Sequence, residues 1–92
     1  MATQLTQGEA YTAKIQASYG TGVLQVIYGN ATIYLHGSLN GSDYTLIESF
    51  SESEIKELVL VPYFKYSSSA TDEDASGSLG THKVIIDETR GG

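Results

Sequence analysis

Residues 22–50, GVLQVIYGNATIYLHGSLNGSDYTLIESF, carry the strongest structural signal in this chain. Apolar and polar residues alternate along the stretch, and the alternation breaks at Gly29-Asn30 and again at Asn40-Gly41. Asn-Gly between alternating runs is a strong β-hairpin signal, because a type I′ turn needs positive φ at both central residues. Gly29-Asn30 meets the same requirement in reverse order. The stretch therefore predicts two consecutive hairpins, which form a three-stranded antiparallel meander.

Two-residue turns would fix the register of this meander. Val26 would lie opposite Ile33, and Leu35 opposite Leu46. The predicted core face then consists of Leu24, Val26, Tyr28, Ile33, Leu35, Tyr44 and Leu46. The opposite face consists of Val23, Gln25, Ile27, Thr32, Tyr34, His36, Thr45 and Ile47. A slip of one residue would exchange the two faces, so this assignment depends on the length of both turns.

Four further strands are expected outside the meander. Alternation predicts strands over residues 11–17 and 63–67, and a short apolar run predicts another over residues 82–88. Residues 55–61 end at Pro62, which cannot donate to a ladder, and a capping box at Ser51-x-x-Glu54 allows one helical turn before them. A polar, acidic loop fills residues 68–81.

Length and composition agree with a single small all-β domain. The 92 residues are 40% hydrophobic and only 17% charged, with many tyrosines and glycines and no cysteine. We expect a small antiparallel β-sandwich or partly open barrel of about seven strands over residues 9–89. Residues 1–8 are expected to be an N-terminal arm, and residues 90–92 a C-terminal tail.

The charge balance and the hydropathy pattern narrow the range of partners. The formal net charge is −6, from 11 acidic and 5 basic residues, which argues against binding of a nucleic-acid backbone. The N-terminus lacks the basic start and apolar core of a signal peptide, and no apolar run approaches the roughly 20 residues that span a bilayer. We expect no nucleic-acid partner and no membrane partner.

The residues that could carry chemistry are few and scattered. Without cysteine, a nucleophile would be Ser or Thr, with His36 or His82 as its base, and neither histidine sits in a triad-like spacing. His36 is expected to be partly exposed on the outward face, and His82 to be solvated. The run Asp72-Glu73-Asp74 lacks the spaced oxygens and the glycine of a calcium loop. The sequence predicts a protein that is not an enzyme, with no catalytic residue, cofactor or metal site.

The second face of the meander is unexpectedly apolar. It carries Val23, Ile27, Tyr34 and Ile47, and exposed apolar area of this kind usually marks a partner interface. These four residues are the candidate interface, with the N-terminal arm as an additional strap. Another strand or the arm could instead cover this face within the same domain, and the sequence leaves both readings open.

Two runs of sequence resemble small β-sandwich virion proteins of tailed bacteriophages. They are Gly29-Asn-Ala-Thr-Ile-Tyr-Leu-His-Gly-Ser-Leu-Asn-Gly-Ser-Asp-Tyr-Thr-Leu and Leu58-Val-Leu-Val-Pro-Tyr-Phe-Lys-Tyr. Such proteins often carry a strand ending in a Gly-Ser-x-(Asp/Asn)-Gly-x-x-(aromatic) hairpin, and later an apolar strand ending in Pro-Tyr. The resemblance covers roughly residues 22–88, and the matching positions are turn and core residues.

The resemblance implies a structural role in a virion, and the chain looks most similar to capsid decoration (cement) proteins. Such a protein would be assembled in the host cytoplasm and would sit on the capsid exterior. Its partners would be the major capsid protein or other virion proteins, and copies of itself. Two alternatives remain at this point. One is a neck, tail or head-fibre component, and the other is a small carbohydrate-binding adsorption module with Tyr34, Tyr63 or Tyr66 as its platform.

Overall fold

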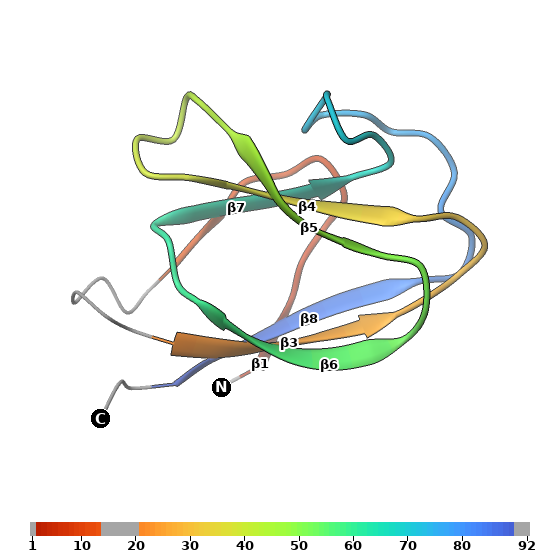
Figure 1. Cartoon of the computed structure of the whole chain (residues 1–92), viewed down its shortest axis with the longest axis horizontal. Coiled ribbons are helices and arrows are strands. Elements are labelled where there is room, and N and C mark those ends of the chain that lie inside the picture. The colour runs from red at the N-terminus through yellow and green to blue at the C-terminus, as the bar shows by residue number, and fades with distance from the viewer. Residues whose placement is uncertain (1, 14–20, 90–92) are drawn as a thin grey trace.

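The chain folds as two antiparallel sheets packed face to face (Figure 1). The computed structural model describes residues 2–13 and 21–89, and these residues contain eight strands and no helix. Sheet A has the order β1-β8-β3-β6, and sheet B has the order β2-β7-β4-β5. The strands are β1 (Ala2–Gln4), β2 (Tyr11–Thr12), β3 (Thr21–Ile27), β4 (Ile33–Ser38), β5 (Thr45–Phe50), β6 (Glu54–Val59), β7 (Tyr63–Ser67) and β8 (Lys83–Thr89). The predicted all-β class and the antiparallel sandwich are confirmed.

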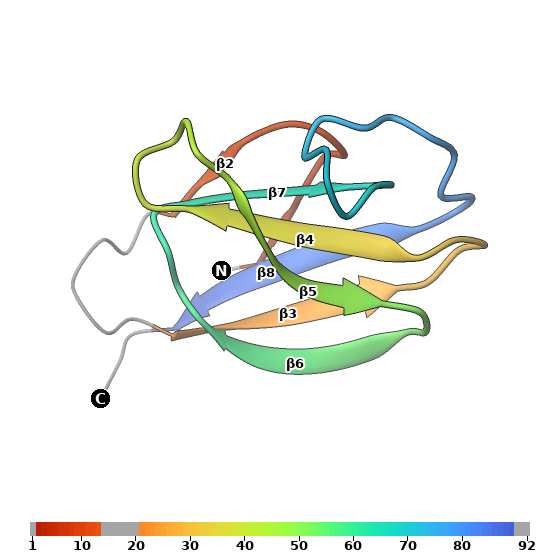
Figure 2. The same cartoon turned by 45° about the horizontal axis from the view of Figure 1, so that its top comes forward.

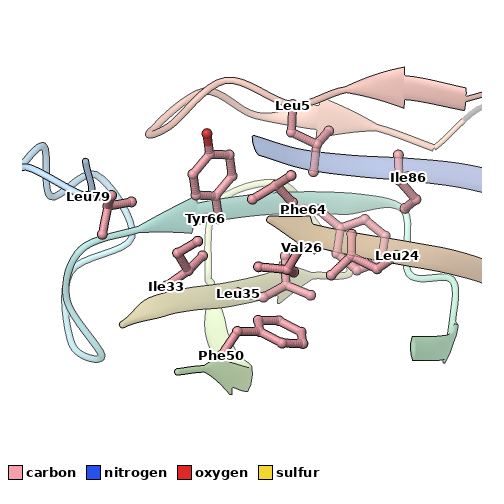
Figure 3. Packing of buried hydrophobic residues seen from close by; sticks show 11 residues of the cluster. Leu5, Leu24, Val26, Ile33, Leu35, Phe50, Phe64, Tyr66, Leu79 and Ile86 are labelled. Atoms are coloured by element: carbon pink, nitrogen blue, oxygen red, sulfur yellow. The ribbon is translucent and has the colours of Figure 1, made fainter. Parts of the chain in front are cut away.

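One apolar core lies between the two sheets (Figure 3). Alternating residues of the long strands point into it, as a half-buried sheet requires. The buried cluster consists of Leu5, Leu24, Val26, Ile33, Leu35, Phe50, Phe64, Tyr66, Leu79, Val84 and Ile86. The core assignment of Leu24, Val26, Ile33 and Leu35 is therefore confirmed.

The predicted hairpin at Gly29-Asn30 is wrong. β3 pairs with β6 and β8 in sheet A, whereas β4 pairs with β5 and β7 in sheet B. The segment between them crosses from one sheet to the other, so Val26 and Ile33 enter the core from different sheets and are not neighbours in one sheet. The Asn30 amide donates to the Leu79 carbonyl at 3.1 Å, which ties this crossing to the loop before β8.

The second hairpin is confirmed, but its turn is longer than two residues and its register differs from the prediction. Residues 39–44 connect β4 to β5, and a bulge follows, so that His36 pairs with Leu46 while Leu35 pairs with Glu48. The Asn40 side-chain oxygen accepts the backbone N–H groups of Ser42 and Asp43, each at 2.9 Å, and so organises the longer turn. Because of this shift, Leu46 is 40% exposed and Tyr44 is half-buried. The residue of β5 that is buried in the core is Phe50. Tyr28, also assigned to the core, is half-buried.

The remaining strands lie close to their predicted positions. β7 has the predicted bounds, β8 is displaced by one residue, and β6 occupies residues 54–59 without a helical turn before it. The expected strand over residues 11–17 is represented by β2, and residues 14–20 lie outside the described part of the chain.

The predicted N-terminal arm is part of the sandwich and is not a loose extension. β1 pairs with β8 in the register Ala2 to Asp87, and the Leu5 amide donates to the Val84 carbonyl at 2.8 Å. Leu5 is only 6% exposed, because it packs into the core. The pairing with β8 and the burial of Leu5 together hold this segment against sheet A.

Candidate functional site

The outward side of sheet A carries a group of apolar side chains that no other part of the described chain covers. Strand alternation turns Leu24 and Val26 toward the core and their neighbours toward solvent. The register then aligns the outward residues of β3, β6 and β8 across the sheet. We call Val23, Ile27, Ile55, Val59 and Ile85 the apolar face.

Exposure on the apolar face is highest on the edge strand β6 and lower on β3 and β8, where Val23 and Ile85 are half-buried. Ile55 is 67% exposed, Val59 is 69% exposed and Ile27 is 37% exposed. A shallow hollow of about 290 Å³ lies in this face, lined by Ala2, Val23, Gln25, Ile55, Ile85 and Asp87. Several large aliphatic side chains on one side of one sheet exceed the scattered apolar residues that are normal on a protein surface.

The outward side of sheet B is different, because a segment of the same chain covers part of it. In Figure 2 the connection from β7 to β8 arches over the sheet B side, away from sheet A. His36 lies on this outward side but is only 2% exposed, so the expectation that it is partly exposed is wrong. Its Nε2 atom donates to the Ser69 carbonyl at 3.0 Å, within the covering segment. This loop therefore shields sheet B, and sheet A keeps its outward side open.

The edges of the two sheets are poor docking sites. β1 has three residues and β2 has two, so each offers only a few backbone groups. The edge strand β5 contains the bulge, and the edge strand β6 turns Lys56 inward to pair with Glu48 across the gap between the sheets. Short strands, bulges and inward charges are devices that prevent strand addition at an edge. A face of the sandwich is therefore a better surface for contact with a partner than an edge.

The structure does not bring the four predicted interface residues together. Val23 and Ile27 lie on β3 and belong to the apolar face of sheet A. Tyr34 lies on β4, on the opposite side of the sandwich, where it is half-buried. Ile47 lies in the bulge of β5, and its Cδ1 atom approaches Gly37 at the side of sheet B that faces the core. The prediction of one patch depended on the first hairpin. Because β3 and β4 lie in different sheets, the predicted patch is divided between the two sides of the sandwich.

Three residues of the apolar face were missed from the sequence: Ile55, Val59 and Ile85. Ile85 had a usable signal, because it alternates with Lys83 and Asp87, and alternate residues of a strand point to the same side. Ile55 and Val59 alternate with Glu57, which also indicates one face. What no local pattern supplied was that β6 lies next to β3.

Both histidines act as structural groups. The Ser67 hydroxyl lies 3.2 Å from His36 Nε2, but Ser67 is fully buried, and its Oγ lies 2.9 Å from the Ser69 carbonyl and 2.8 Å from that of Asp72. His82 was expected to be solvated, yet it is half-buried and its Nε2 atom accepts the Tyr66 hydroxyl at 2.9 Å. Burial raises the pKa of the Tyr66 phenol above its ordinary value, so this hydroxyl remains a donor.

The tyrosines considered as a sugar platform do not converge. Tyr66 is 3% exposed and belongs to the core. Tyr34 pairs with Ser67 and Tyr63 pairs with Ser38, which places the two tyrosines at opposite ends of the β4–β7 ladder. A stacking platform requires aromatic rings on one patch, and these residues do not form one.

Two polar side-chain contacts join the sheets. The Tyr11 hydroxyl of β2 contacts the Glu88 carboxylate of β8, and burial followed by this contact raises the pKa of Tyr11 far above its ordinary value. On the other side, the hydrogen bond from Lys56 lowers the pKa of Glu48. Among the described residues, no cluster of three or more His, Asp or Glu side chains could hold a metal ion.

A second hollow, of about 490 Å³, lies at the β4–β5 turn. It is lined by Gly37, Ser38, Leu39, Asn40, Asp43, Thr45, Ile47 and Val61. Its polar groups are largely used within the turn, since Ser38, Asn40 and Asp43 bond to one another. The apolar face therefore remains the stronger candidate site.

Comparison with known protein families, with curated proteins and with solved structures finds no match to this chain. Within residues 2–13 and 21–89 there is no helix of the length and hydropathy needed to cross a membrane.

Proposed function

We propose that this chain is a non-enzymatic structural protein of a bacteriophage virion, and that it acts by protein contact as a capsid decoration protein. The observation that carries the contact role is the apolar face, with Ile55 and Val59 both more than two-thirds exposed. Blocked edges and a partly covered sheet B favour this face over the other surfaces. The virion setting comes from the resemblance of residues 22–88, and the capsid exterior agrees with the acidic net charge of −6.

In this role the chain would hold the shell by many repeated contacts, on the major capsid protein and on neighbouring copies of itself. Each contact can be weak, because a lattice of sites gives avidity. A small, rigid, two-layer protein suits this task, since little conformational entropy is lost when its sheet face is covered.

The presence of the chain in particles is the first test. Virions of the phage whose genome holds the gene are purified, and their heads and tails are separated and analysed by mass spectrometry. We expect the chain in the head fraction, in proportion to the major capsid protein. Its absence from particles, or its recovery with tails alone, would contradict the proposal.

The contact surface is tested with particles that lack the chain, to which recombinant protein is added back. Ile27→Asp places a charge on the apolar face and is expected to lower the affinity for particles at least tenfold, because the charge would be desolvated in the contact. Tyr34→Ala changes the opposite side of the sandwich and is expected to bind as the wild type does. Both variants are first compared with the wild type by thermal unfolding. The reverse result, with Tyr34→Ala alone defective, would move the contact to sheet B.

A further inference from the structure

We infer that the apolar face docks a second copy of this chain, face to face about a two-fold axis, with Lys83 of each copy over Asp87 of the other. This inference rests on the proposed use of the apolar face as a contact surface. It assigns that face to the contact between neighbouring copies, which strengthens their hold on the shell by avidity. A two-fold contact requires a surface that is complementary to itself, so that one residue meets another in both directions. The two charges of β8 and the amide of Gln25 meet that requirement. Glu57 also points outward, but it lies on the edge strand β6, at the rim of such a contact.

The charges on the outward side of β8 are arranged in the order that such pairing needs. Lys83, Ile85 and Asp87 all point outward, and consecutive members are about 6.6 Å apart along the strand. Lys83 lies beside Ile27 at one end of the ladder, and Asp87 lies beside Val23 toward the other end. Among the described residues of this face, Lys83 is the one cation. Ile85 lies midway between Lys83 and Asp87, so an axis that exchanges these two charges passes through Ile85.

The two-fold axis would run across the strands, through Ile85, Gln25 and Ile55, which lie in one row of the sheet. Rotation about this axis places each residue of that row opposite the same residue of the other copy. It also places Ile27 over Val23 of the other copy, and Lys83 over Asp87. Asp87 is exposed, and a carboxylate with two oxygens accepts more than one hydrogen bond, so it can receive the incoming ammonium.

An axis along the strands gives a much poorer contact. It would leave the rows in place and exchange β8 with β3, so that Lys83 would face Ile27 and Asp87 would face Val23. The Lys83 ammonium would then lose water to an apolar side chain without gaining an ionic partner, which is costly. The pattern of charges therefore selects the axis that crosses the strands.

Gln25 supports the same arrangement. It is an exposed polar residue in the central row, flanked by Ile85 and Ile55. Burial of its amide requires a partner that both donates and accepts hydrogen bonds. A second glutamine amide supplies both, because its carbonyl accepts and its NH₂ group donates.

The size of the face sets the expected strength of the dimer. Sheet A is four strands wide and its longest strands have seven residues. With the usual spacings between strands and residues, two such faces would bury on the order of 900 Å² in total. Interfaces of that size are weak or transient. The dimer is therefore expected at high protein concentration in solution, or on a particle that holds copies close together.

The experiment is a charge reversal followed by sedimentation velocity, over a concentration series that reaches about 1 mM. The wild type is expected to shift from monomer toward dimer along the series. Lys83→Asp alone, or Asp87→Lys alone, would set like charges against each other at two symmetric positions, and is expected to weaken the dimer about tenfold. Lys83→Asp combined with Asp87→Lys is expected to restore dimerisation to within a few-fold of the wild type.

Glu9→Lys is the matched control, because it changes the net charge as Asp87→Lys does, at an exposed position outside sheet A. It is expected to leave the dimer intact. Each variant is checked by thermal unfolding. A wild type that stays monomeric at the highest concentration, or a double variant that is as weak as the single variants, would overturn the inference.

These outcomes can be separated from failure of the proposed function. If Ile27→Asp loses particle binding while the wild type never dimerises, the apolar face contacts the shell directly, and only the inference fails. If the charge-reversed dimer behaves as expected but the chain is absent from virions, the inference stands and the virion role fails.

Discussion

At the scale of one residue, Gly29 has a different role from the one that its sequence context suggests. Before Asn30 it resembles a turn residue, but it does not adopt a positive φ, unlike Gly41, whose φ of +80° lies in a genuine turn. Its role is spatial, since a Cβ atom at Gly29 would lie 2.1 Å from the Leu79 carbonyl oxygen. The crossing between the sheets passes so close to the loop before β8 that it excludes any side chain.

Gly29→Ala is therefore expected to destabilise the fold by about 1–3 kcal/mol, because the neighbour that must move is backbone. The free energy of unfolding is measured by urea denaturation. Gly77→Ala is the control, since its new methyl group would meet only the Ser68 side chain, which can rotate. Equal midpoints for Gly29→Ala and the wild type would show that the crossing tolerates a side chain.

At the scale of elements, β6 shows how the chain protects an exposed edge. Every residue of β6 except Leu58 is exposed, and the strand is paired on one side only, with β3. Lys56 points toward the gap between the sheets, where its ammonium pairs with Glu48 of β5. A charge directed inward from an edge strand makes the addition of a further strand unfavourable.

Lys56→Val is expected to make the protein aggregate faster on heating, because it removes the inward charge and adds a β-branched residue beside Ile55 on an edge strand. Aggregation is followed by light scattering, with Thr71→Val as a control that adds the same side chain to an exposed loop. If both variants scatter light at the same rate, Lys56 has no protective role at this edge.

At the scale of the whole molecule, polar side-chain contacts join the two sheets in addition to the core. Tyr11 of β2 and Glu88 of β8 make such a contact at one side of the sandwich. Burial of the Tyr11 phenol, and its contact with a carboxylate, keep the phenol protonated far above its ordinary range. The protonation state of this residue therefore reports whether the sheets are together.

This contact predicts a loss of stability at alkaline pH. An unfolded chain releases the tyrosine proton near pH 10, whereas the folded chain retains it to higher pH, so the native state binds more protons in that range. The free energy of unfolding should then fall as the pH rises above about 10. Tyr11→Phe removes the titrating group and should give a shallower fall, measured by urea denaturation at several pH values. An unchanged slope in Tyr11→Phe would contradict this account.

The sequence by itself determined most of the strands and, in β3 and β4, the apolar side chains that they bury. Leu24, Val26, Ile33 and Leu35 were identified as core residues because a strand alternates its side chains with a period of two, which is a local property. The assignment held even though the pairing of β3 with β4 was wrong, since a residue on the inner side of either sheet reaches the same core. Where the turn was longer than expected, at residues 39–44, the same local rule failed and Leu46 left the core.

Only the tertiary structure decided which strands are neighbours, and with them the candidate site. β3 lies between β8 and β6, which come from distant parts of the sequence, and the apolar face exists because this order aligns Val23, Ile55 and Ile85. Strand pairing depends on long-range contacts whose free energy is shared among many residues. Local alternation of side chains does not specify which strand pairs with which. The outward direction of Ile27 was therefore predictable from the sequence, whereas its neighbours on the surface were not.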